Sequence, residues 1–158
     1  MIQLPFEDET FDAVLSYSSL QYADADATLK EAMRVLAPGG RMALTENLRQ
    51  SPIPRVFRTL RRPMGFEKDR NQIPQDHVDW SWLKSLESHF SSVELEAHHL
   101  LAPLALVVPT LKQAATSGAW TEPGTGLMRV LSKVDQGLCT RAPSLSRYCW
   151  FGVALCIK

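Results

Sequence analysis

Residues 34–46 read Arg-Val-Leu-Ala-Pro-Gly-Gly-Arg-Met-Ala-Leu-Thr-Glu, a run in which a helix ends, the chain turns and an apolar strand begins. Pro38 disfavours helical geometry in the residue before it. The two glycines that follow can adopt the backbone conformations that a tight turn requires. The run therefore predicts a helix that stops just before the proline and a strand over residues 41–46.

The residues upstream of this run predict a first strand and the body of the helix. Residues 11–17 form a short apolar stretch between an acidic turn and two serines, which is typical of a strand covered on both faces of a parallel sheet. Asp24 or Asp26 can cap the helix that follows. The expected unit is a strand, a crossover helix and a second strand. Three apolar side chains share the helix face that would cover the sheet: Leu29, Met33 and Leu36.

The pattern is looser after residue 46, where four prolines interrupt residues 48–78 and leave room for one short helix. Further helices and strands are expected downstream from apolar periodicity and β-prone composition. The predicted helices cover residues 80–90, 103–120 and 127–138, and the predicted strands cover residues 93–100 and 148–157.

Composition limits the class of protein. A chain of 158 residues with 45% hydrophobic and 22% charged residues fits one globular domain. Seventeen basic residues balance seventeen acidic ones, so no nucleic acid partner is expected from overall charge. The three cysteines have no CxxC spacing, which favours reduced thiols over a zinc site. No stretch predicts a transmembrane segment or a signal peptide, and we expect a cytoplasmic location.

The order of these motifs resembles the second half of a class I S-adenosylmethionine (SAM) dependent methyltransferase domain of the type 11 kind. The motifs are Leu4-Pro5-Phe6, Phe11-Asp12 and the Pro-Gly-Gly turn, and the resemblance covers residues 4–46. It implies a partial Rossmann-like α/β fold: a mostly parallel sheet with an antiparallel last strand, helices on both faces and the first strands missing. We expect one truncated domain over residues 1–158. It would carry a lid-like segment at residues 48–78 and a helical insertion at residues 103–143.

The resemblance also implies a function and a set of site residues. The expected reaction is methyl transfer from SAM to an unidentified small-molecule acceptor. Tyr22 and His77 are the candidate catalytic residues, and Glu46 and Asn47 are the candidates for substrate contact. Residues that close the strands at the cofactor edge are the candidates for binding SAM: Met1, Ile2, Ser16, Tyr17 and Gln21.

Each of these residues also has a simpler interpretation. Tyr17 and Tyr22 could be half-buried aromatic residues with hydrated hydroxyl groups. Glu46 could contact only solvent at a strand end. His77 is the histidine best placed for acid-base chemistry, because His98 and His99 would point to opposite faces of a strand.

Two functions therefore stay open at this point. The family's glycine-rich turn has no counterpart before Leu4, so the chain alone is not expected to complete a cofactor site. In one hypothesis the chain is the substrate-facing half of a small-molecule methyltransferase. In the other it is a non-catalytic remnant that acts, if at all, in protein interaction. Under either, the bare edge of the first strand predicts a homodimer or a partner strand.

Overall fold

The chain consists of two compact units, which we call the sheet unit and the helical unit. The computed structural model describes residues 3–61, 77–105 and 125–158. The sheet unit comprises residues 1–49, 74–96 and 151–158, and the helical unit comprises residues 50–73 and 97–150. Residues 62–76 of the predicted lid and 106–124 of the predicted insertion lie outside the described residues, so the predictions made for them stay predictions.

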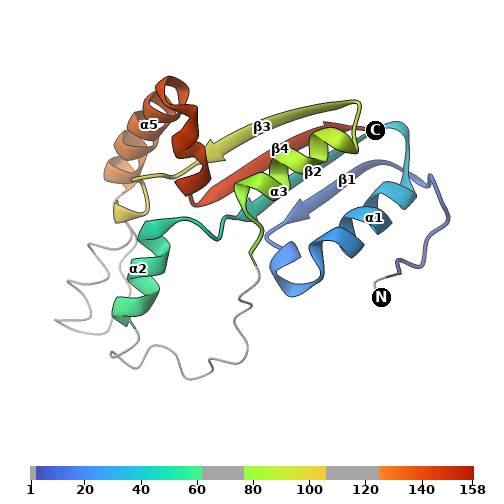
Figure 1. The fold of residues 1–158 in the computed structure, drawn as a ribbon, viewed down its shortest axis with the longest axis horizontal. Helices are drawn as coiled ribbons and strands as arrows, with labels where there is room; N and C mark the ends of the chain where they lie inside the picture. The colour runs from blue at the N-terminus through green and yellow to red at the C-terminus, as the bar shows by residue number, and fades with distance from the viewer. Residues whose placement is uncertain (1–2, 62–76, 106–124) are drawn as a thin grey trace. The chain divides into compact units, whose positions relative to one another are not determined.

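The sheet has four strands in the order β1-β2-β4-β3 (Figure 1). β1 pairs with β2 in parallel, and β2 pairs with β4 in antiparallel orientation. The α/β fold and the antiparallel last strand are therefore confirmed. The mostly parallel sheet is matched only in part, because one of these two pairings is parallel and the other is antiparallel. The strands are β1 (Phe11–Tyr17), β2 (Leu36–Asn47), β3 (Ser92–His98) and β4 (Phe151–Ile157).

The helices of the sheet unit begin at aspartate caps. α1 (Ala25–Val35) starts after Asp24, whose carboxylate accepts a hydrogen bond of 2.8 Å from the amide of Ala27. α3 (Trp80–Ser85) starts after Asp79, which accepts a bond of 3.0 Å from the amide of Trp82, and a 3₁₀ turn (Leu86–Ser88) extends it. The predicted helices are therefore confirmed, with Asp24 rather than Asp26 as the first cap.

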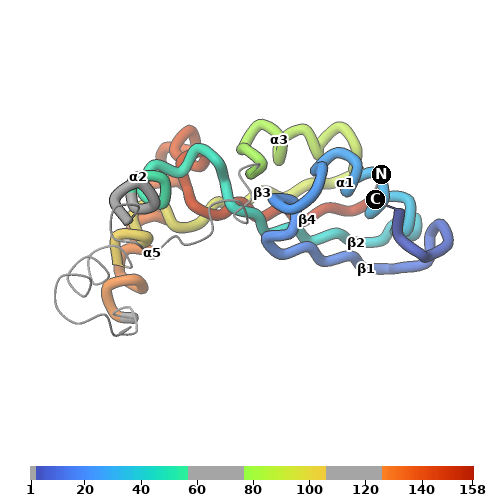
Figure 2. The backbone as a smooth tube through the Cα atoms, turned by 90° about the horizontal axis from the view of Figure 1, so that it is seen from below, coloured from blue at the N-terminus to red at the C-terminus, as the bar shows by residue number. Residues whose placement is uncertain are grey.

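The core of the sheet unit lies between one face of the sheet and these two helices, which lie on the same side of the strands (Figure 2). Met42 and Leu44 of β2 point into it. The other face is open: Leu15 is 77% exposed and Tyr17 is 70% exposed. We expected β1 to be covered on both faces and helices on both sides. The described helices of this unit cover only one.

β2 starts earlier than the sequence predicted. Its pairing with β1 begins at Leu36, shifts register after that pair and resumes at Arg41. The shift contains Gly39, which has a φ of 74°, a conformation that favours glycine. The Gly39 amide donates to the carbonyl of Lys158 over 3.2 Å. The predicted turn is thus an irregularity inside a longer strand, held by the end of β4.

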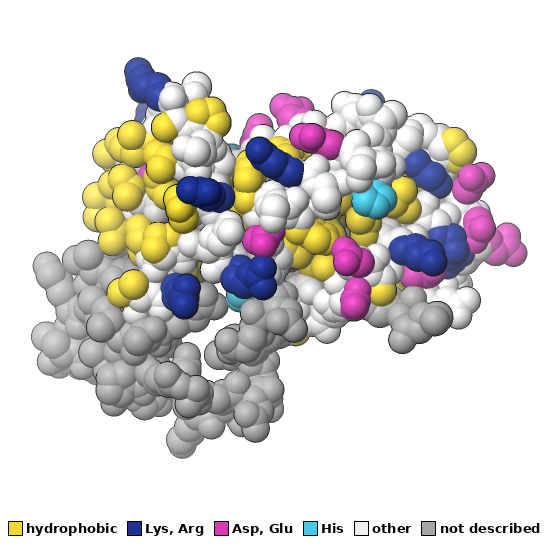
Figure 3. All heavy atoms as spheres, viewed as in Figure 1, with side chains coloured by type: hydrophobic (Ala, Val, Ile, Leu, Met, Phe, Trp, Pro, Cys, Tyr) yellow, Lys and Arg dark blue, Asp and Glu magenta, His cyan; other side chains and the backbone are white. Residues whose placement is uncertain are grey.

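The helical unit contains α2 (Pro52–Arg61), α5 (Thr125–Arg141) and a 3₁₀ turn (Pro143–Tyr148). α5 extends the helix predicted over residues 127–138. One face of α5 carries a stripe of exposed apolar side chains, which Figure 3 shows as hydrophobic atoms gathered over the helix. A different face carries buried Asp135 and, one turn later, Cys139. The exposed stripe consists of Leu127, Val130, Val134 and Leu138.

Candidate functional site

The loop after β1 has an unusual backbone that its neighbours hold in place. Ser18 has a φ of 47°, a left-handed conformation that non-glycine residues adopt infrequently. Its amide donates to the carbonyl of Thr45 over 2.7 Å. Its carbonyl accepts from Gln21 over 3.0 Å, and its hydroxyl accepts from the amide group of Asn47 over 3.2 Å. These three bonds fix the loop at the carboxyl ends of β1 and β2.

The buried side chain of Glu46 holds the same loop in place. Its side chain is 1% exposed, and Oε1 accepts bonds of 3.1 Å from the Ser16 hydroxyl, 3.1 Å from the Ser19 amide and 3.3 Å from the Leu20 amide. Burial raises the pKa of the Glu46 carboxyl, although these hydrogen bonds act in the opposite direction. Glu46 is therefore a buried anchor of the loop that leads to Gln21.

A cleft of about 930 Å³ lies beyond this loop, within the sheet unit. It brings together three of the predicted site residues, Gln21, Tyr22 and His77, from segments far apart in the sequence. The start of α1 and the start of α3 form its walls. The remaining lining residues are Ala23, Asp24, Ala25, Asp26, Arg49, Val78, Asp79, Ser81 and Trp82.

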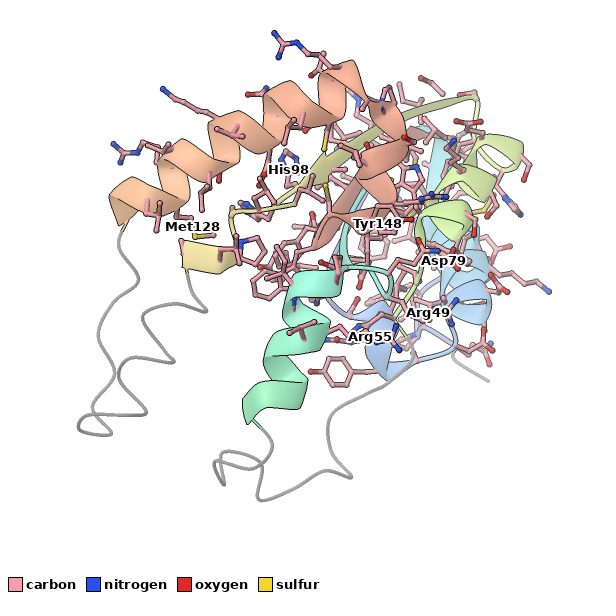
Figure 4. The ribbon with its side chains drawn as sticks, turned by 60° about the vertical axis from the view of Figure 1, so that its left-hand side comes forward. Arg49, Arg55, Asp79, His98, Met128 and Tyr148 are labelled. Atoms are coloured by element: carbon pink, nitrogen blue, oxygen red, sulfur yellow. The ribbon has the colours of Figure 1, made fainter. Side chains whose placement is uncertain are left out.

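Three carboxylates and one guanidinium set the charge of the cleft. Arg49 points toward Asp79, and their nitrogen and oxygen lie 2.9 Å apart (Figure 4). A hydrogen bond from the Ser81 hydroxyl is the main reason that the pKa of Asp79 is lowered. Asp26 accepts a bond of 2.7 Å from the indole of Trp82. Neither Asp24 nor Asp26 forms an ion pair with a described residue, so the cleft is acidic overall.

The remaining predicted residues are distributed around the loop. Ser16, Glu46 and Asn47 lie in its hydrogen-bond network, as described above, whereas Tyr17 points into solvent from β1. Met1 and Ile2 lie outside the described residues. Whether any of these side chains binds cofactor or substrate stays a prediction.

Sequence reasoning did not place two residues of the cleft in this site: Arg49 and Asp79. Asp79 had a detectable signal, since an aspartate directly before a helical pattern is a typical N-cap. Arg49 and Asp79 are 30 positions apart, and no local pattern indicates that they pair.

Residues 3–61, 77–105 and 125–158 contain no group of three or more His, Cys, Asp or Glu side chains that could hold a metal ion. Over the same ranges, no helix combines the length and the apolar character that crossing a membrane requires.

The strand, helix and strand next to this site are similar to parts of known proteins. The family described as "Methyltransferase domain" matches residues 1–44. An uncharacterized methyltransferase of Mycobacterium bovis is 28% identical over 148 residues, which are 91% of this chain and 55% of that protein. Over these residues the chain is similar to methyltransferases. Its class I fold, expected from the order of the motifs, is confirmed by structural similarity.

The solved methyltransferase structures support the fold of this chain. At their low sequence identity they support nothing about its function. A Thermotoga maritima protein, described as a SAM-dependent methyltransferase and possible histamine N-methyltransferase, superposes with a TM-score of 0.51 at 17% identity. The match covers 99% of this chain and 60% of that one.

A further relative is similar in sequence over a shorter stretch. Demethylmenaquinone methyltransferase of Corynebacterium glutamicum is 45% identical over 60 residues, 37% of this chain and 25% of that protein. The chain thus spans between a quarter and three fifths of these methyltransferases.

Proposed function

We propose that the chain takes part in SAM-dependent methyl transfer and that its cleft holds a small-molecule acceptor. One observation carries the proposal. Gln21, Tyr22 and His77 line one cleft next to the carboxyl ends of β1 and β2. Open α/β sheets bind their ligands beyond the carboxyl ends of the parallel strands. The predicted role in protein interaction is not favoured, because the relatives of the chain are methyltransferases.

The described residues fit the methionine end of SAM better than the nucleoside end. Ser16, Tyr17 and Gln21 offer hydroxyl and amide groups along a loop whose backbone Ser18 and Glu46 hold in place. These groups suit the ammonium and carboxylate of a methionine moiety. Met1 and Ile2 stay the predicted contacts of the adenine. When bound, SAM supplies a methyl group that its sulfonium has already activated.

The chain's own residues then have to orient the acceptor and keep water away from it. Tyr22 and His77 are the cleft residues that the proposal assigns to proton transfer with the acceptor, whereas Glu46 is held by protein donors below the loop. Asp24 and Asp26 disfavour an anionic acceptor. The proposal is therefore a neutral or cationic acceptor, whose reacting atom is oxygen, nitrogen or carbon.

Calorimetric titration with S-adenosylhomocysteine tests the donor side of this proposal. The groups at the methionine end alone should give weak but saturable binding to the folded chain. Gln21→Ala, which removes a cleft side chain and its bond to Ser18, should weaken this binding at least fivefold. Gln136→Ala on the exposed face of α5 is the matched control and should leave affinity unchanged. No heat from a sample with native circular dichroism would contradict the proposal for the chain alone.

The acceptor side is tested by transfer of a radiolabelled methyl group from SAM to a panel of amines, phenols and carboxylates. Neutral and cationic compounds should be labelled in preference to carboxylates, and Asp26→Asn should reduce that preference. Equal labelling of carboxylates would contradict the charge argument. The cytoplasmic location and the pairing at the β1 edge stay predictions.

A further inference from the structure

Two thiols of the helical unit lie next to each other. The sulfur atoms of Cys139 and Cys149 are 3.5 Å apart, and both cysteines are free. Cys139 is on α5 and is partly exposed, whereas Cys149 is buried where the 3₁₀ turn gives way to β4. A disulfide requires a sulfur separation of about 2.05 Å, so the pair has to close by roughly 1.5 Å. We expect rotation of the two side chains to supply this movement.

The backbone around the two thiols is held from both sides by one segment, residues 99–102. The Asp135 carboxylate, one turn before Cys139, accepts bonds of 2.8 Å from the Leu101 amide and 3.0 Å from the Ala102 amide. The amide of Trp150, next to Cys149, donates to the carbonyl of His99 over 3.0 Å. The same short segment thus binds both α5 and the residue after Cys149, which keeps the two sulfur atoms within reach of each other.

The two thiols differ in their burial and therefore in how readily a reagent reaches them. Burial is the main cause of a strongly raised pKa of Cys149, and Cys139 and the buried Asp135 act in the same direction. Cys149 is therefore a neutral thiol at physiological pH, and a thiolate there is costly. A disulfide carries no charge and suits this buried place. Cys139, with part of its side chain exposed, is the sulfur that an oxidant reaches first.

We propose that Cys139 and Cys149 are a reversible thiol-oxidation site that closes to an intramolecular disulfide when the protein meets a small-molecule disulfide. The Cys139 thiolate attacks the reagent, whose sulfur–sulfur bond breaks and releases one thiolate. The Cys149 sulfur then attacks the Cys139 sulfur, and the second thiolate leaves. Two protein thiols are oxidised, one reagent disulfide is reduced to two thiols, and the two protons pass to the leaving groups.

The disulfide would change the helical unit in a defined way. It would join the last turns of α5 to the residue that precedes Trp150 and close a short covalent loop. Such a loop stabilises a protein chiefly by restricting the unfolded chain. We expect the melting temperature of the oxidised protein to rise by about 5 °C and to return to its original value on reduction.

Mass spectrometry of the full chain tests the proposal. Reduced protein is incubated with oxidised glutathione, alkylated and digested. We expect a peptide in which Cys139 and Cys149 are linked and a protein mass that has lost two hydrogens. Cys149→Ser should stop at a glutathione adduct on Cys139, and Cys139→Ser should give neither product.

Cys156 provides the matched control, because it is a buried thiol of β4, and burial raises its pKa to about 11. Cys156→Ser should still form the disulfide. Wild-type protein that accumulates only the glutathione adduct, or that links Cys156 instead, would overturn the proposal. The wild-type result suffices even where a cysteine variant does not fold.

Discussion

At the scale of single residues, the clearest prediction concerns the buried carboxylate of Glu46. Glu46→Ala would leave the amides of Ser19 and Leu20 without their acceptor, and we expect it to lower the free energy of unfolding by about 2–4 kcal/mol. Glu46→Gln keeps a carbonyl acceptor and removes the titrating charge. Because the pKa of Glu46 is raised in the folded state, the native protein loses stability as pH rises above the ordinary carboxyl value of 4.5. The free energy of unfolding of the Gln variant should therefore increase relative to that of wild type as pH rises above that value.

Urea denaturation at several pH values measures this difference, and Glu31 supplies a control of opposite sign. Glu31 pairs with Arg34 over 3.0 Å, and this hydrogen bond is the main cause of its lowered pKa. Its contribution to stability is present above the ordinary pKa and is lost as pH falls. The free energy of unfolding of Glu31→Gln should therefore decrease relative to that of wild type as pH rises. If the free energy of unfolding of Glu46→Gln does not increase relative to that of wild type as pH rises, the buried-carboxyl argument is refuted.

The same residues show how far site prediction from sequence can go. Placing Glu46 and Asn47 at a strand end, and Gln21 and Tyr22 after the previous strand, required only the order of motifs. The burial of Glu46 could not be predicted, because it depends on a loop 26 positions away along the chain folding over its carboxylate. The acidity of the cleft likewise arises from two helix starts that are remote in sequence.

At the scale of elements, the contact between α3 and β4 depends on Gly152. A Cβ atom built there would lie 2.3 Å from Cδ1 of Leu83 and 3.1 Å from Cδ2 of Leu48. Leu83 is fully buried, so it cannot move aside at low cost. We expect Gly152→Ala to lower the free energy of unfolding by about 1–3 kcal/mol, measured by chemical denaturation.

Gly126 in α5 is the matched control for this substitution, because a Cβ atom there meets nothing within 4 Å. Gly126→Ala should be neutral or stabilising by up to about 1 kcal/mol, as alanine favours helices. The double variant Gly152→Ala and Leu83→Ala should lose less stability than the sum of the two single losses, because the smaller residue 83 leaves room for the new methyl group. Equal effects of the two glycine substitutions would show that α3 does not pack closely on β4.

The elements themselves were predictable where the pattern was local. β1, α1 and α3 follow from apolar runs and aspartate caps, and their observed positions agree with the prediction. The early start of β2 was not predictable, because it depends on Lys158, at the other end of the chain, pairing with Gly39 and Gly40. The division into two units depends on contacts between distant segments and has no local signal either.

At the scale of the whole molecule, the open face of the sheet leads to a prediction about self-association. β1 is an edge strand of the described sheet, and on its open face Leu15 and Tyr17 are 77% and 70% exposed. An apolar edge strand favours pairing with another strand, and in a pure sample the available partner is a second copy of the chain. We expect sedimentation velocity to show reversible self-association that increases with concentration in the micromolar range.

Leu15→Lys tests whether this face is responsible. The substitution places a charge on the exposed face of β1, where it removes no buried contact and opposes strand pairing. It should shift the association to higher concentration and leave the circular dichroism unchanged. Glu87→Lys, on the exposed 3₁₀ turn after α3, makes a larger change in charge away from β1 and should still associate like wild type. A monomeric wild-type protein over the same range, or equal association of Leu15→Lys and wild type, would show that the β1 edge does not recruit a second copy.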